Sequence, residues 1–300
     1  MEYFLELLLG GLTRGSIYAL IALGYTMVYG IIELINFAHG EIYMIGAFTG
    51  LIAASILTMK GLQGPAVLIL ACIVAVVYAA AYGLTVEKIA YKPLRNAPRL
   101  SPLISAIGMS IFLQNYVLLV QTPDFLPFPS LIPEFAFMEP FSHIMGSSEL
   151  VILVTTTALM VALTVLIKFT RMGKAMRATA QDRSMAMLVG VNVNRVISTT
   201  FVIGSALAAV GGVLIASHIG QINFAIGFIA GIKAFTAAVL GGIGSVPGAA
   251  LGGVVLGLTE SFATGYVSSD YEDVFAFALL VLILIFRPEG LLGRAKAQKV

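Results

Sequence analysis

Several stretches of this sequence run for about twenty residues with almost no charge. One example is PAVLILACIVAVVYAAAYGLTV, residues 65–86. An α-helix needs about 20 mostly apolar residues to cross the hydrocarbon core of a bilayer. Only 11% of the residues are charged, and soluble domains carry about 25%. The stretches also lack the alternation of a transmembrane β-strand, so the predicted class is an all-α polytopic membrane protein.

The apolar stretches predict about nine transmembrane helices, with eight as the alternative. The first lacks a basic leader and is too long for a signal sequence, so we expect it to remain as a span. The predicted spans are about 5–29, 42–59, 65–86, 102–121, 148–168, 196–218, 226–243, 247–266 and 272–286.

The basic residues predict the orientation of these spans. Of the 17 Lys and Arg residues, 14 fall into three clusters. The clusters are Lys88, Lys92, Arg95 and Arg99; Lys168, Arg171, Lys174, Arg177, Arg183 and Arg195; and Arg287, Arg294, Lys296 and Lys299. Basic loops stay in the cytoplasm, whereas 122–147 and 267–271 contain no Lys or Arg. Nine crossings, with the N-terminus outside and the C-terminus inside, satisfy all of these segments.

The sequence contains an internal repeat. Residues 19–49 and 206–236, which are 187 apart, are identical at 15 of 31 positions. The copies include INFAHGEIYMIGAFT (35–49) and INFAIGFIAGIKAFT (222–236). They begin at the first and sixth spans, five crossings apart, so one copy is inverted in the predicted topology. Inverted repeats are characteristic of transporters, which place the pathway at the repeat interface.

The repeat therefore predicts matching broken or short helices near 30–48 and 222–245 that face a shared pathway. The alternative is a packing motif with no contact to substrate. Within the repeat, the candidate pathway or gate residues are Asn36, Phe37, His39, Glu41, Asn223, Phe224 and Lys233. Glu33, His39 and Glu41 have a second interpretation as solvated or capping residues.

Two charged residues fall inside predicted spans. Lys233 lies in the seventh span and Glu260 in the eighth. A charge at membrane depth is costly unless it faces a cavity or a partner. Lys233 is therefore expected to point inward, to snorkel or to pair, with Glu260 as a plausible partner. Both are candidate pathway residues.

Glycines recur at the spacing of close helix packing, where small residues let two backbones approach. The residues are Gly244, Gly248, Gly252, Gly253 and Gly257. The run LGGIGSVPG lacks the Lys-Ser/Thr ending of a nucleotide-binding loop, so any use of ATP is assigned to another subunit.

The basic loop of about 170–195 predicts a short amphipathic helix. Gly190 and Asn192 are expected to end it, and it could lie on the membrane or dock in the groove of a soluble partner. The residues assigned to this loop are Arg171, Gly173, Lys174, Met176, Arg177, Asp182, Gly190 and Asn192.

No metal or catalytic site is expected. The three histidines are far apart and lack a metal-binding spacing, and Cys72 is the single cysteine. No motif of a hydrolase is present, so the chain is not predicted to be an enzyme.

Three segments resemble one family in order along the chain. They are GYTMVYGIIELINFAHGEIYMIGAF, RMGKAMRATAQD followed by GVNVNRV, and KAFTAAVLGGIGSVPGA. Together they closely resemble the permeases of branched-chain amino acid ABC importers, of the LivH type. Glu33 departs from the pattern, because a small residue is usual at this position in the family.

The resemblance implies a subunit of the bacterial inner membrane that translocates leucine, isoleucine and valine. It implies a homologous permease of the LivM type as partner, two cytoplasmic ABC ATPases that bind ATP and Mg²⁺, and a periplasmic binding protein. The chain itself would bind no cofactor, and no nucleic acid is expected as partner. The loop after Arg171 would carry the helix that docks on an ATPase.

The predicted organisation is one permease domain over 1–300. It comprises a first repeat (about 5–121), a linking span (148–168), the coupling loop (170–195) and a second repeat (196–287). Two other functions remain open. One is a permease of the same family for urea or short-chain amides, which share the INxAHGE phrase, and the other is a stand-alone channel or ion-coupled carrier.

Overall fold

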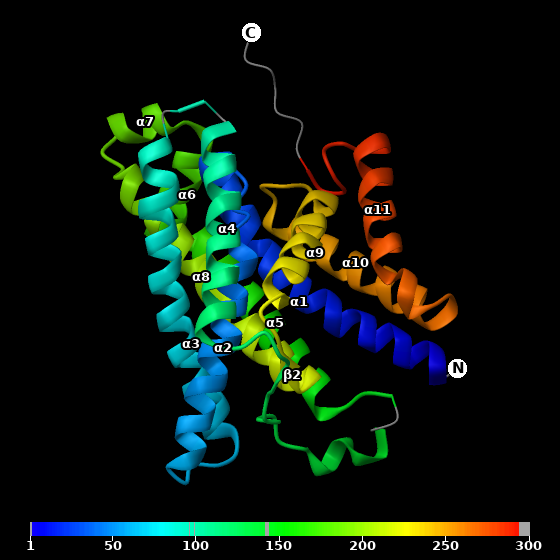
Figure 1. The fold of residues 1–300 in the computed structure, drawn as a ribbon. Helices are drawn as coiled ribbons and strands as arrows, with labels where there is room; N and C mark the ends of the chain where they lie inside the picture. Colours follow the sequence, from blue (N-terminus) through cyan, green and yellow to red (C-terminus); the bar gives the residue numbers. More distant parts are fainter. Residues whose placement is uncertain (1, 96, 99, 142–143, 294–300) are drawn as a thin grey trace.

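Helices make up nearly all of the computed structural model (Figure 1). It describes residues 2–95, 97–98, 100–141 and 144–293. Of the basic residues in the predicted clusters, Arg99, Arg294, Lys296 and Lys299 lie outside the described residues. The all-α polytopic class is confirmed.

Seven helices among the described residues are long and apolar enough to cross a membrane. They are α1 (Glu2–Ile32), α2 (His39–Met59), α3 (Pro65–Val86) with its extension to Leu94, α4 (Leu100–Val120), α5 (Ser147–Phe169), α8 (Val193–Ile219) and α10 (Val246–Tyr266). Helices α9 (Ile226–Gly241) and α11 (Glu272–Phe286) occupy the other two predicted spans but have only 16 and 15 residues. The count of nine crossings stays a prediction.

The repeat is visible in the positions of the helix ends. Helix α1 ends at Ile32 and α8 at Ile219, and α2 begins at His39 and α9 at Ile226. Each pair of positions is separated by the same 187 residues as the sequence repeat. Both copies thus break a long helix, at residues 33–38 and 220–225, as the repeated phrase predicts.

Helix packing is reciprocal between the two copies. Helix α1 packs along α10, and its counterpart α8 packs along α3. Helix α2 contacts α8, α9 contacts α1, and α2 and α9 contact each other. Each of these contacts of one copy thus has a counterpart in the other copy.

Glycines allow the closest of these helix contacts. A Cβ on Gly253 would lie 2.4 Å from the Ala19 nitrogen, and one on Gly257 would lie 2.2 Å from the Gly15 nitrogen. Of the glycines predicted to pack helices, Gly248, Gly252, Gly253 and Gly257 lie so close to neighbouring backbone that an added Cβ would collide with it. The expectation is wrong for Gly244, which lies in the turn before α10 with a φ of +95° and no atom within 4 Å of an added Cβ.

Two connections lie at opposite ends of the molecule in Figure 1. One holds α6 (Arg171–Gln181) and α7 (Arg183–Leu188). The other holds β1 (Leu126–Pro127), which pairs antiparallel with β2 (Gln221–Ile222). The proline-rich segment 122–147 is therefore attached to the second helix break.

Candidate functional site

The first helix break, residues 33–38, is buried and held by a tyrosine. The Tyr91 hydroxyl donates to the Ile35 carbonyl at 3.0 Å and lies 3.2 Å from Asn36 Oδ1. Asn36 is only 1% exposed. Backbone that leaves a helix at membrane depth needs such partners, since the bilayer supplies none.

The first turns of α2 and α9 meet through equivalent glycines. A Cβ on Gly40 would lie 2.3 Å from the Gly227 carbonyl oxygen, and one on Gly227 would lie 2.7 Å from the Gly40 carbonyl oxygen. The partial positive charges of two helix N-termini therefore converge. The buried Glu41 carboxylate lies at this junction, where Ser110 donates to Oε1 at 3.1 Å.

His39 is buried with Glu41 at the start of α2. Its ring meets Tyr25 edge-on at a centroid distance of 4.9 Å. Gly24 makes room for it, since a Cβ there would lie 2.2 Å from His39 Nε2. The interpretation of His39 and Glu41 as solvated residues is wrong, because two helix N-termini and the α1 backbone cover them. Glu33 is exposed, as that interpretation expected.

The second break, residues 220–225, is built from different contacts. Leu126 and Pro127 pair with Ile222 and Gln221. Asn223 is half-buried, and its Oδ1 accepts a hydrogen bond from the Ala225 amide at 3.2 Å. The strand β1 thus hydrogen-bonds the backbone of the second break, whereas the Tyr91 side chain hydrogen-bonds the backbone of the first.

A cavity of about 410 Å³ lies against the second break. Residues of α1, α2, α8, β2, α9 and α11 line it, including Lys233, together with Phe125 and with Asn223 of the second break. Small-molecule pockets generally measure about 300–1,000 Å³, so the cavity is large enough for a small metabolite.

Lys233 holds three carboxylates at one end of this cavity. Its Nζ lies 2.7 Å from Glu272 Oε1, 2.8 Å from Asp273 Oδ1 and 3.2 Å from Glu260 Oε1. Tyr18 donates to Glu260 Oε2 at 2.7 Å. The expected Lys233–Glu260 pair is therefore present, as part of a larger group.

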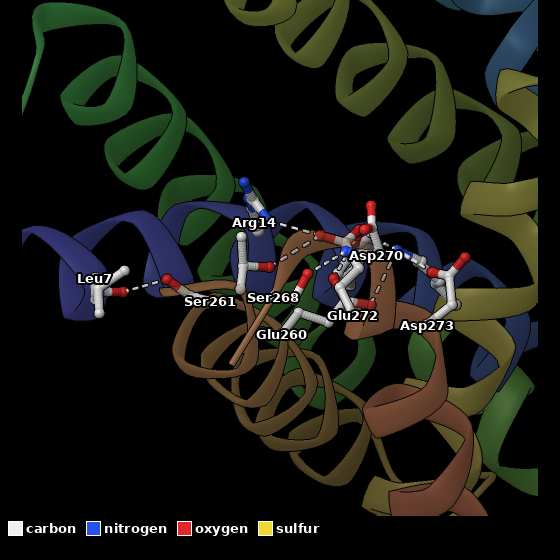
Figure 2. A network of polar contacts seen from close by, with 11 residues as sticks. Leu7, Arg14, Glu260, Ser261, Ser268, Asp270, Glu272 and Asp273 are labelled. Atoms are coloured by element: carbon white, nitrogen blue, oxygen red, sulfur yellow. Dashed lines mark hydrogen bonds and ion pairs between the residues drawn. The ribbon is translucent and has the colours of Figure 1, made fainter. Parts of the chain in front are cut away.

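Figure 2 shows how Arg14, Glu260, Glu272 and Asp273 converge from α1, α10 and α11. Arg14 reaches Glu272 Oε2 at 3.3 Å. The three carboxylates lie within 4.8 Å of one another, close enough to hold a cation. The Lys233 ammonium already supplies that positive charge, so the chemistry of the group does not call for a metal ion.

The segment that holds α6 and α7 contacts the end of α1, directly before the first break. Arg183, the first residue of α7, donates to the Ile31 carbonyl from Nε at 3.0 Å and from a terminal nitrogen at 2.7 Å. This carbonyl is in the last turn of α1, where helix carbonyls lack partners. Burial lowers the pKa of the Arg183 guanidinium from its usual value, while Glu33 opposes that shift; arginine nonetheless stays protonated in proteins. A cavity of about 320 Å³ separates this segment from Tyr91 and Arg95.

The rest of the connection follows its predicted turns. Gly190 has a φ of +87°, and Asn192 caps α8 by accepting from the Arg195 amide at 3.0 Å. Asp182 divides the predicted helix by capping α7. The apolar face of α6 is turned inward, since Met176 is buried. The outward apolar surface of the connection is on α7 and just after it, at Met185, Met187, Leu188 and Val189.

The predicted site residues thus fall into three groups. Asn36, His39 and Glu41 surround the first break, while Asn223, Lys233 and Glu260 surround the second. Phe37 packs against Phe235 at a centroid distance of 5.9 Å, and Phe224 is half-buried against the core. The residues Arg171, Gly173, Lys174 and Arg177 lie on α6. Of these, Arg177 lines a cavity together with Glu33 of the first break.

The prediction missed Arg14, Tyr18, Tyr91 and Arg183. A signal existed for Arg14 alone, since it is a basic residue inside the first span. Tyr18, Tyr91 and Arg183 could not be singled out, because tyrosines in spans and arginines in loops are common and their sequence positions do not reveal their contacts.

Paired helix breaks, apolar spanning helices and ion pairs at membrane depth define a polytopic transport protein. Residues 7–284 match the family described as the permease component of branched-chain amino acid transport systems. The chain belongs to this family.

The similarity extends over nearly the full length. The chain is 52% identical to the high-affinity branched-chain amino acid transport system permease protein LivH of Escherichia coli (strain K12), covering 99% of this chain and 98% of LivH. It is 52% identical to the permease protein BraD of Pseudomonas aeruginosa, with the same coverage. It is 27% identical to the permease protein LivM of Salmonella typhimurium, over 95% of this chain and 70% of LivM.

Proposed function

We propose that this chain is the permease subunit of an ABC importer that moves leucine, isoleucine and valine across the bacterial inner membrane. The observation that carries the proposal is the 52% identity to LivH and BraD over 99% of the chain. Both relatives carry branched-chain amino acid transport in their names, which favours this cargo over urea or short-chain amides.

The proposed assembly contains a second, homologous permease, two cytoplasmic ATPases and a periplasmic binding protein. Similarity to both LivH and LivM of Salmonella typhimurium supports the second permease, because one organism carries both proteins. ATP and Mg²⁺ would bind in the ATPases.

The two halves are proposed to be inverted relative to each other, with the N-terminus outside and the C-terminus in the cytoplasm. Reciprocal helix packing and the breaks at equivalent residues support this arrangement. The two breaks, including Asn36 and Asn223, would then form the parts of the pathway that move when access alternates.

The α6–α7 segment is proposed to carry motion from an ATPase to the first break. The Arg183 contact to the Ile31 carbonyl supports this role, since it ties α7 to the last turn of α1. The apolar side chains of α7 supply a surface for docking, with Leu188 79% exposed.

The complex, purified from native membranes and reconstituted in liposomes, should import leucine only with the binding protein and ATP. Uptake by the isolated chain without nucleotide would instead indicate a channel or ion-coupled carrier. Import of urea or acetamide but not leucine would indicate the other cargo.

Leu188→Asp should abolish copurification of the ATPases and reduce ATP-driven leucine uptake at least about tenfold, as expected for a charge placed in an apolar contact. Leu62→Asp, at the α2–α3 turn on the other end of the molecule, is the matched control. Normal uptake by the Leu188→Asp complex would refute docking through α7.

A further inference from the structure

The cavity at the second break has an apolar wall and a charged end. Six isoleucines line it: Ile17, Ile215, Ile219, Ile222, Ile226 and Ile229. Arg14, Lys233 and Glu272 line the same cavity. We infer that the cavity binds one zwitterionic amino acid with an aliphatic side chain, its carboxylate against Arg14 and its ammonium against Glu272. The inference rests on the proposed function and names the place where this chain itself recognises its cargo.

The apolar wall favours a branched aliphatic side chain. The isoleucines come from α1, α8, β2 and α9, so they surround the space rather than form one stripe. Polar side chains line other parts of the same cavity, namely Tyr18, Tyr43, His218, Gln221 and Asn223. The isoleucines themselves offer no hydrogen bond, so a polar side chain placed against them would lose its contacts to water. Ala230 also lines the cavity and leaves room beside the isoleucines.

The charged end presents opposite charges side by side. Arg14 and Glu272 are 3.3 Å apart, which matches a ligand whose carboxylate and ammonium are attached to the same carbon atom. Among the described residues, the hydrogen bond and ion pair of the Arg14 side chain go to Glu272, and the side chain is 44% exposed. Most of its five N–H donors are therefore free to bind a carboxylate.

Lys233 has a different role at this end. Its ammonium already meets three carboxylates and its side chain is 5% exposed. It therefore positions Glu272 for the ligand rather than binding the ligand carboxylate itself.

Charge balance favours a ligand with no net charge. The four groups Arg14, Lys233, Glu260 and Glu272 carry two positive and two negative charges. Asp273 also pairs with Lys233 at 2.8 Å, but it is 59% exposed, so solvent screens much of its charge. A zwitterion leaves the balance unchanged, whereas lysine or glutamate would bring an uncompensated charge into a partly buried site.

Occupancy can be measured through a single thiol in the full transporter complex. Ile229→Cys, in a Cys72→Ala background, places the thiol on the wall of the cavity. Saturating leucine should slow its reaction with a maleimide at least tenfold, while lysine and glutamate should not. Ile69→Cys, on the exposed side of α3, is the matched control and should react at the same rate with or without leucine.

Two substitutions test the two ends separately. Arg14→Gln in the Ile229→Cys background should remove the protection by leucine, whereas Arg14→Lys should retain part of it. Ala230→Leu should fill the apolar end and lower the maximal uptake rate of leucine about tenfold, with a smaller loss for valine. Ala81→Leu, on the exposed side of α3, should change neither rate.

The outcomes separate this inference from the proposed function. If the wild-type complex imports leucine but leucine does not protect the Ile229→Cys thiol, the inference is overturned and the proposed function stands. Equal protection by lysine or glutamate would also overturn it. If the wild-type complex imports no branched-chain amino acid, the proposed function itself fails.

Discussion

The two helix breaks have related sequences but different supports. Residues 33–38 are held from inside by Tyr91, and the last turn of α1 before them is linked to α7 by Arg183. Residues 220–225 are held by β1, and the segment after β1 is fixed to α8 by Ser217, which accepts from the Leu131 amide at 3.1 Å. Each break lines a cavity, one shared with the α6–α7 connection and the other with Phe125 of the proline-rich segment.

The difference shows how a duplicated element acquires two roles. The repeat supplies the break itself. Residues outside it, namely Tyr91, Arg183 and β1, supply most of the supporting contacts, and differences between the copies supply others. Gly46 of the first copy corresponds to Lys233 of the second, and Glu33 corresponds to Gly220. The first break is therefore connected to the side that would meet an ATPase, and the second to a charged cavity.

The largest expected effect concerns Lys233, which has no charged counterpart in the first copy. Lys233→Met should destabilise the protein by about 3–5 kcal/mol, because it leaves the buried Glu260 carboxylate without its cation. Thermal unfolding of the purified complex measures the loss.

The double variant Lys233→Met/Glu260→Gln should recover much of that stability, since both buried charges are then removed. A single variant as stable as the wild type would mean that the other residues near Glu260 suffice. The Lys233 charge would then not be a structural difference between the second copy and the first.

A smaller effect is expected at the hydrogen bonds that hold each break. Tyr91→Phe should cost about 1–3 kcal/mol, because it leaves the Ile35 carbonyl without its donor in a buried site. Ser217→Ala should cost a similar amount, because it leaves the buried Leu131 amide without its acceptor. Hydrogen exchange should rise at 33–38 in the first variant and at 126–131 in the second. Faster exchange in both segments for either variant would show that the breaks are not supported separately.

The smallest effect concerns the residue that follows each helix. Glu33 has a φ of +54° and Gly220 a φ of +78°, a region that costs a residue with a side chain about 1–2 kcal/mol. Glu33→Gly should therefore be more stable than Glu33→Ala by about 1 kcal/mol, and Gly220→Ala should be destabilised by a similar amount. Denaturation midpoints of the three variants provide the comparison. Equal stability of Glu33→Gly and Glu33→Ala would show that the backbone relaxes at the first break.

Much of the fold could be predicted from sequence because the bilayer restricts the choices. Long apolar runs predict helices, and the repeat placed both breaks to within a few residues. The cost of a charge in hydrocarbon predicted the Lys233–Glu260 pair. The four-residue spacing of the glycines wrongly predicted that Gly244 lies in the same helix as Gly248, because α10 begins only at Val246.

The site itself was predicted less completely. His39 and Glu41 were placed at the first break, but their burial depends on the backbones of α1 and α9. The inward face of α6 likewise depends on α5, where a Cβ on Gly173 would collide with the Ile167 carbonyl.

The residue pattern was therefore sufficient for the class of protein, the duplication, the positions of the breaks and the need of Lys233 for a carboxylate. These properties follow from local periodicity and from the cost of burying charge. The folded arrangement was needed to find Arg14 and Glu272 side by side, β1 against β2, and Arg183 against the end of α1. Those partners are 94 to 258 residues apart in the chain, and residues that distant meet only because helix packing brings them together.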